Sequence, residues 1–140
     1  MTDPSQDFAE VNVLTATVIE AAIRIHRDLG PGLLESVYES LLTHALEKKG
    51  LHVLRQQAVR LSYDGVTIDD GFRVDILVAH QLVVELKSTI RMEPVFLRQL
   101  LTYLRLMNLP VGLLINFGGA TLKEGLHRVI NSRVAPQITS

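Results

Sequence analysis

The tripeptide Glu85-Leu86-Lys87 combines a carboxylate and an ammonium group within a short apolar stretch. In an extended strand, residues two apart project from the same face, about 6.6 to 6.8 Å from one another, so Glu85 and Lys87 would lie side by side. Such a pair can help to hold a divalent cation and can place a positive charge beside a phosphate group. The alternative is a strand with one solvated face, and the tripeptide alone does not distinguish the two.

Asp75 lies in the apolar segment Val74–Val78, where an unpaired carboxylate would be costly to bury. A cation coordinated by Asp75, Glu85 and the carbonyl of Leu86 would supply a partner. Mg²⁺ prefers oxygen ligands from one or two carboxylates together with waters and phosphate. Lys87 would then orient or deprotonate the attacking water and offset charge on the phosphate. These residues therefore predict hydrolysis of a phosphodiester with Mg²⁺ or Mn²⁺ as cofactor.

This metal site requires both acids on one face of a sheet. Residues directly opposite one another in an antiparallel pair share a face, and a strict two-residue loop at His80-Gln81 would pair Asp75 with Leu86. The two acids would then lie on opposite faces. We therefore predict a loop of odd length, such as Ala79-His80-Gln81, or a bulge, which pairs Asp75 with Glu85.

Two helical segments carry further candidates. Glu35 and Tyr38 are three apart in a predicted helix and can meet one ligand together, although Glu35 can also simply favour a helix N-terminus. Gln99 and Tyr103 are four apart on one face of another predicted helix, where the alternative is a solvated face with Tyr103 partly packed. Ser88, directly after the tripeptide, is a candidate phosphate contact.

The elements that must position these residues follow the order helix, helix, antiparallel strands, helix, strand, helix. Apolar periodicity and turn residues predict helices over residues 11–29, 34–47, 94–107 and 122–130. They predict strands over residues 51–54, 58–63, 66–68, 72–79, 82–87 and 111–117. Turns are expected at Asp64-Gly65 and at Asp69-Asp70-Gly71. The strand-helix-strand segment from Leu82 to Phe117 predicts a parallel crossover, so we expect an α/β fold with a mixed central sheet flanked by helices.

Length and composition indicate one domain, which we place at residues 9–131 with flexible termini at 1–8 and 132–140. The 14 Lys and Arg residues nearly balance the 15 Asp and Glu residues, so any binding to nucleic acid must be local. Without cysteine, thiolate metal sites are excluded, and the five histidines show no metal-binding spacing. The uncharged stretch Leu106–Leu122 is interrupted by Asn, Pro and Gly, so we expect no membrane contact. The N-terminus lacks the order of a secretion signal, which favours the cytoplasm.

The motifs together resemble a known family. Their order is Gly32-x-x-Glu35-x-x-Tyr38, Asp75, Glu85-x-Lys87 and Gln99-x-x-x-Tyr103. This order resembles the GxxExxY protein family, a branch of the PD-(D/E)XK nuclease superfamily, over roughly Val11 to Arg128. The stretch Leu114-Ile115-Asn116-Phe117-Gly118 looks like the closing core strand of that family, whereas Val74 stands where the superfamily often has proline.

The resemblance implies a restriction-endonuclease-like core and a role for each motif. Asp75 and Glu85 would be metal ligands, Lys87 the catalytic lysine, and Glu35 an additional acid that acts directly or through water. Gln99 and Tyr103 match a helix motif that supports the site and DNA in exonuclease-type relatives.

Two functions of different classes follow from the sequence. The first is a Mg²⁺- or Mn²⁺-dependent deoxyribonuclease. Its expected partner is nucleic acid, and DNA is favoured over RNA. The second is a non-catalytic module that keeps the nuclease fold to bind nucleic acid or a partner protein, which the near-neutral charge favours. A homodimer would widen either kind of surface.

Overall fold

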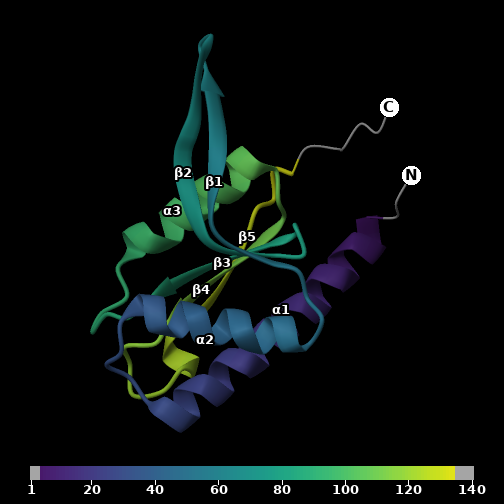
Figure 1. Ribbon diagram of the computed structural model, residues 1–140. Coiled ribbons are helices and arrows are strands. Elements are labelled where there is room, and N and C mark those ends of the chain that lie inside the picture. Colours follow the sequence, from purple (N-terminus) through teal and green to yellow (C-terminus); the bar gives the residue numbers. More distant parts are fainter. Residues whose placement is uncertain (1–3, 135–140) are drawn as a thin grey trace.

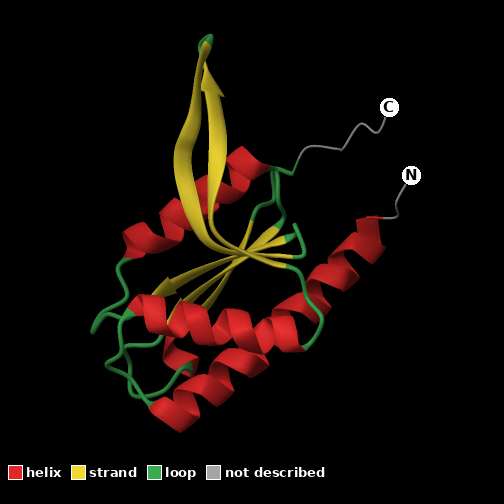
Figure 2. Cartoon of the chain, viewed as in Figure 1, coloured by secondary structure: helices red, strands yellow, loops and turns green. Residues whose placement is uncertain are grey.

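A computed structural model of the chain describes the backbone of residues 4–134 and the side chains of residues 9–134. Helices cover both faces of one sheet (Figures 1 and 2). The helices are α1 (Pro4–Leu29), α2 (Glu35–Lys48) and α3 (Pro94–Met107), with the short 3-10 helix η1 (Lys123–Gly125). The strands are β1 (Val53–Tyr63), β2 (Val66–Val78), β3 (Leu82–Lys87), β4 (Val111–Asn116) and β5 (Leu126–Ile130).

The sheet has the strand order β1-β2-β3-β4-β5, in which only the pair β3 and β4 is parallel. These two strands are joined through α3, as the crossover prediction required. Helices α1 and α2 lie side by side on one face of the sheet, and α3 lies on the other (Figure 2). The expected α/β fold with a mixed central sheet is therefore confirmed.

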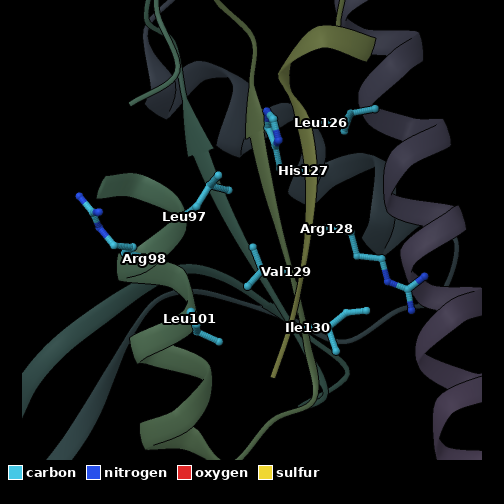
Figure 3. A pocket seen from close by; sticks show the side chains of 8 residues that line it. All are labelled: Leu97, Arg98, Leu101, Leu126, His127, Arg128, Val129 and Ile130. Atoms are coloured by element: carbon cyan, nitrogen blue, oxygen red, sulfur yellow. The ribbon is translucent and has the colours of Figure 1, made fainter. Parts of the chain in front are cut away.

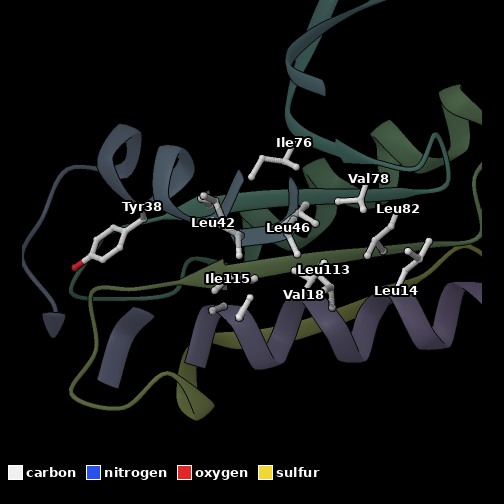
Figure 4. Close-up of a cluster of buried hydrophobic side chains, with 14 of the residues drawn as sticks. Leu14, Val18, Tyr38, Leu42, Leu46, Ile76, Val78, Leu82, Leu113 and Ile115 are labelled. Carbon is white, nitrogen blue, oxygen red and sulfur yellow. The ribbon is translucent and has the colours of Figure 1, made fainter. Parts of the chain in front are cut away.

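Two apolar cores lie on opposite faces of the sheet. The larger one joins α1 and α2 to Ile76 and Val78 of β2 and to the even-numbered residues of β3, among them Val84 (Figure 4). The smaller one joins α3 to Val74, Leu77 and Val83. Because side chains alternate along a strand, the odd-numbered positions of β3 face α3.

A long hairpin formed by β1 and β2 projects from the body of the protein (Figure 1). The predicted turn at Asp64-Gly65 is confirmed, and both residues have left-handed backbone torsions, with φ of 50° and 78°. The turn predicted at residues 69–71 is wrong, because these residues lie within β2, where the register shifts opposite Val59 and Leu61. Gly71 permits this bulge, since an added Cβ would lie 2.7 Å from the Cβ of Leu61.

The helix predicted at residues 122–130 is also wrong, because this segment forms η1 and then β5. The reason lies in the neighbouring strand. β4 is buried along its whole length, and its backbone groups on the side away from β3 would lack partners without β5. Five residue pairs between β4 and β5 satisfy them, which outweighs the local helical spacing.

Helix α1 begins at Pro4, before the predicted start at Val11, so part of the predicted flexible segment 1–8 is helical. Residues 1–3 and 135–140, also expected to be flexible, lie outside the described residues. Across residues 4–134, none of the helices has the length and apolarity needed to span a membrane.

Asn116 and Gly118 fasten the end of β4 to the segment that follows the tripeptide. The Asn116 side chain accepts hydrogen bonds from the backbone N–H groups of Thr89 and Gly118, both at 3.0 Å, and donates one to the carbonyl of Thr89. A Cβ on Gly118 would lie only 2.1 Å from that carbonyl oxygen. The close approach therefore holds Thr89, two residues after Lys87, against β4.

Substitution of Gly118 by Ala should lower the free energy of unfolding by about 1–3 kcal/mol, because backbone atoms of Thr89 must move to admit the methyl group. Urea unfolding monitored by circular dichroism would measure the loss. Gly119→Ala is the matched control, since its nearest neighbouring atom is at 3.4 Å. Equal stability of the two variants would contradict the proposed close contact.

Candidate active site

The antiparallel register of β2 and β3 brings the two predicted metal ligands together. Val78 pairs with Leu82 and Ile76 with Val84, so the connection is the three-residue loop 79–81 and the same register puts Asp75 opposite Glu85. The backbone N–H of Asp75 donates to Glu85 Oε1 at 3.2 Å. The prediction of an odd loop with both acids on one sheet face is confirmed.

Glu85 is buried in an environment that disfavours its charge. The residue is only 7% exposed. Burial, and then the negative charge of Asp75, raise the pKa of Glu85 from 4.5 to about 9, although the positive charge of Lys87 opposes the rise. Two close carboxylates with this degree of burial form a donor set that a hard divalent cation would stabilise.

The backbone of Leu86 contributes to the same place. Its N–H donates to Asp75 Oδ2 at 2.9 Å, so this backbone group points toward β2. The carbonyl of Lys87 instead accepts from Phe117 at 2.8 Å, on the side of β4. Because successive carbonyls alternate in direction along a strand, the Leu86 carbonyl points toward β2 and Asp75. This direction is compatible with the predicted role of the Leu86 carbonyl as a ligand.

Lys87 lies on the same sheet face as the two acids and contacts α3. Its ammonium Nζ lies 4.4 Å from the centroid of the Phe96 ring, a cation–π geometry. Phe96 is a residue that the sequence interpretation missed. Its position three residues before Gln99 on the predicted helix was the available signal, because it shares that helical face.

Tyr103 and Gln99 lie on the helix that covers this face. The Tyr103 ring stacks on Phe72 of β2 at 4.3 Å between centroids. Burial, followed by the negative charges of Glu85 and Asp75, raises the pKa of the Tyr103 phenol. Gln99 is exposed on the same helical face, between Phe96 and Tyr103.

The structure places Glu35 and Ser88 elsewhere. Glu35 is exposed in the first turn of α2, and nowhere in residues 9–134 do three His, Asp or Glu side chains gather as metal ligands. The expected additional acid is therefore not brought together with Asp75 and Glu85. The Ser88 hydroxyl donates to the carbonyl of Leu33 at 2.7 Å, so it fastens the loop between α1 and α2 to the end of β3.

Tyr38 is a core residue, which corrects the expectation of a substrate contact. Its side chain is fully buried, and its ring stacks on Phe117 at 4.2 Å between centroids. The hydroxyl donates to the carbonyl of Gly30 at 2.6 Å and accepts from the backbone N–H of Leu33. Figure 4 shows it pointing away from the apolar cluster. Tyr38 therefore holds the turn that connects α1 and α2.

A second glutamate of α2, which the sequence interpretation missed, reaches the site through Gln56. The Gln56 amide nitrogen donates to Glu39 Oε1 at 2.6 Å and to Asp75 Oδ1 at 3.1 Å. Glu39 is 7% exposed. It lies four residues after Glu35, one helical turn along, and this spacing was the only signal in the sequence.

An open groove of about 510 Å³ lies between α3 and β5 (Figure 3). It is lined by Leu97, Arg98, Leu101, Leu126, His127, Arg128, Val129 and Ile130. None of these residues belongs to the predicted site, and Leu97 and Leu101 project from α3 in a different direction from Phe96 and Tyr103. We assign the chemistry to the acidic face, because a hollow of this size without convergent reactive groups does not define an active site.

The fold and the facing Asp, Glu and Lys side chains define a candidate hydrolase site of the nuclease type. Residues 12–129 match the family described as the PD-(D/E)XK nuclease superfamily. The match covers most of the chain, so the protein belongs to that superfamily, whose members generally use divalent metal ions. Comparisons with curated proteins and with solved structures gave no significant match.

The raised pKa of Glu85 makes stability depend on pH. Between pH 4.5 and about 9 the carboxyl stays protonated in the folded chain and ionises in the unfolded chain, so its contribution to stability falls as the pH rises. In EDTA, wild type should therefore lose stability relative to Glu85→Gln across this range, as measured by urea unfolding. Glu20→Gln, at an exposed position of α1, is the control and should follow wild type. If the free energy of unfolding changed with pH in the same way for wild type and Glu85→Gln, the raised pKa of Glu85 would be contradicted.

The structural role of Tyr38 predicts an effect on stability alone. Tyr38→Phe removes the hydroxyl that bonds to the carbonyl of Gly30 and the N–H of Leu33, so the free energy of unfolding should fall by about 0.5–1.5 kcal/mol. Mn²⁺ affinity measured by calorimetry should stay unchanged. Tyr63→Phe is a matched control, because Tyr63 is 80% exposed. A Tyr38→Phe variant of normal stability that lost nucleic-acid binding would restore the role in substrate contact.

Proposed function

We propose that the protein is a divalent-metal-dependent nuclease of the GxxExxY type that hydrolyses phosphodiester bonds in DNA. One observation carries the proposal: Asp75 and Glu85 face one another across β2 and β3, with Lys87 on the same side of the sheet. Membership of the PD-(D/E)XK nuclease superfamily supports the same reaction class. Fold alone would not define an activity, so the proposal rests on this arrangement of reactive side chains.

The cofactor we propose is Mg²⁺ or Mn²⁺, held by Asp75, Glu85 and the carbonyl of Leu86. When bound, the ion would supply positive charge to a phosphate oxygen and acidify a water molecule. The two acids favour a bound cation, because the burial of Glu85 beside Asp75 makes added positive charge favourable there. Cation binding should release a proton from Glu85 at neutral pH.

In this proposal, the positive charge of Lys87 contributes to catalysis by electrostatic stabilisation. The Phe96 ring supports its ammonium group on the acidic face, which limits the rotamers that the long side chain can adopt. From there Lys87 would orient the attacking water and stabilise the charge that grows on the phosphate. Gln99 and the Tyr103 hydroxyl, on the adjacent face of α3, are the proposed substrate contacts.

Nucleic acid would meet local rather than overall positive charge, since the formal net charge of the chain is −1. Arg73 lies two residues before Asp75 on β2 and is exposed. Its ion pair with Asp70 is also exposed, so the pair contributes little to stability. The guanidinium has further N–H donors for a phosphate beyond those that bond to Asp70 and to the carbonyl of Gln56. Arg73 is therefore proposed to contact the phosphate backbone of the nucleic acid.

The second candidate is a non-catalytic module that binds nucleic acid or a protein. It is favoured by one observation, that residues 9–134 contain no third carboxylate gathered with Asp75 and Glu85 as a ligand. This function requires the fold but not cation affinity.

Substitution of Lys87 by Ala should reduce the rate of metal-dependent cleavage by at least about 100-fold, because a positioned charge near the transition state is lost. The assay uses purified protein with Mg²⁺ or Mn²⁺ on single- and double-stranded DNA and RNA. Lys123→Ala, at an exposed position of η1, should retain the wild-type rate.

The substrate arms and a calorimetric titration with Mn²⁺ separate the candidates. Cleavage of DNA that EDTA and Lys87→Ala both abolish supports the nuclease, and cleavage of RNA alone would correct its substrate. Binding of nucleic acid without Mn²⁺ affinity or cleavage would favour the non-catalytic module. Activity that persists in Lys87→Ala would contradict the assigned role of the lysine.

A further inference from the structure

The amide nitrogen of Gln56 bridges two carboxylates from different elements. It donates to Glu39 Oε1 at 2.6 Å and to Asp75 Oδ1 at 3.1 Å. An amide nitrogen carries two hydrogens, so both are used here. In the flipped orientation the amide oxygen would face two acceptors, which is unfavourable, so the carboxylates themselves fix the direction of the Gln56 side chain.

The carboxylate of Glu39, which accepts from Gln56, is itself held in place by hydrogen bonds. Its Oε2 accepts two hydrogen bonds from Arg55, from Nε at 3.2 Å and from Nη2 at 3.0 Å. The same Nη2 group donates to the Ser40 hydroxyl at 2.9 Å. Because Glu39 is nearly buried and bonded through both oxygens, it has little freedom to move and can hold Gln56 in place.

The backbone of Gln56 is also unusual. Its φ is 48°, a left-handed conformation that is uncommon for a residue other than glycine. Its neighbours in β1 pair with Val74 and Ile76, which leaves Gln56 opposite Asp75 outside the regular ladder. Arg73 donates to the Gln56 carbonyl at 3.3 Å and helps to hold it there. Such strained residues persist where surrounding contacts over-determine them, often at functional sites.

We propose that Glu39 and Gln56 are positioning residues that hold the Asp75 carboxylate in the orientation required for cation binding. The inference rests on the proposed function, because Asp75 is a ligand only in a metal-dependent nuclease. Gln56 holds Oδ1 of Asp75 and the N–H of Leu86 holds Oδ2, so the plane of the carboxylate is fixed. Each oxygen retains lone-pair capacity for a cation. Outer hydrogen-bond partners of this kind orient ligands in metal sites generally.

Calorimetric titration with Mn²⁺ tests the proposal. Gln56→Ala should weaken the Kd for Mn²⁺ by about 10- to 100-fold, because the Asp75 carboxylate becomes free to rotate. Gln57→Ala is the matched control in the same strand, since its side chain donates to the carbonyl of Ala58 and, among the described residues, to neither Glu39 nor Asp75. Glu39→Leu should weaken the Kd similarly, whereas Glu39→Gln keeps an acceptor for Gln56 and should stay within a few-fold of wild type.

Two outcomes with a functional wild type would overturn the inference. Equal Mn²⁺ affinity of Gln56→Ala and wild type would show that Asp75 needs no support. Tighter binding, or a second bound Mn²⁺, would show that the Gln56 amide instead keeps a second cation from the space between Glu39 and Asp75. Circular dichroism melting of each variant verifies that the folded protein is being titrated.

If the wild type binds no Mn²⁺, the proposed function is contradicted. Thermal unfolding without metal then tests whether the Gln56 side chain interacts with Asp75. The shifts in Tm caused by Gln56→Ala and Asp75→Ala should be non-additive in the double variant, because the two side chains are in contact. The pair Gln57→Ala and Asp75→Ala should be additive. Additive shifts for both pairs would overturn the inference even if the wild type binds Mn²⁺.

Discussion

The register between β2 and β3 is the constraint on which the site depends. It is set by the loop 79–81, where Ala79 and His80 both adopt left-handed backbone torsions with φ of 51° and 57°. A slip of one residue would move every side chain of β3 to the other face. Glu85 would then enter the larger apolar core, and Leu86 would leave it. Because both faces of β3 are buried, packing on each face resists that slip, and the loop and the cores select the same pairing.

The apolar face of β3 stabilises the strand, whereas its other face carries the unfavourably buried Glu85. The even-numbered side chains of the strand pack against α1 and α2 in the larger core, which favours this conformation of the strand. On the opposite face, Glu85 is held beside Asp75 in a position where ionisation is unfavourable. Asn116 and the close approach of Gly118 then fasten the chain immediately after Lys87. Reactive groups are thus held near one another by contacts that come mostly from the other side of the sheet.

Two consecutive residues of helix α2 stabilise different parts of the protein, the turn between α1 and α2 and the strand β1. Tyr38 turns into the core and holds the connection to α1, whereas Glu39 reaches β1 and meets Gln56. Consecutive helical residues differ by about 100° in direction, so one can face the sheet while the next faces its edge strand. α3 has a similar division, because Phe96 and Tyr103 face the acids and Leu97 and Leu101 line the groove beside β5. The active face is therefore bounded by two helices that lie on opposite sides of the sheet.

The sequence by itself determined Asp75, Glu85, Lys87 and the odd loop between them, because alternation along a strand has a short, local period. It also determined α3 from its proline start and apolar spacing. Only the tertiary structure decided that residues 126–130 form a strand, since the need of β4 for backbone partners is not visible in those residues. It also decided that Glu39 rather than Glu35 meets the site. The two glutamates are one helical turn apart and share a face, so spacing cannot say which one β1 will reach.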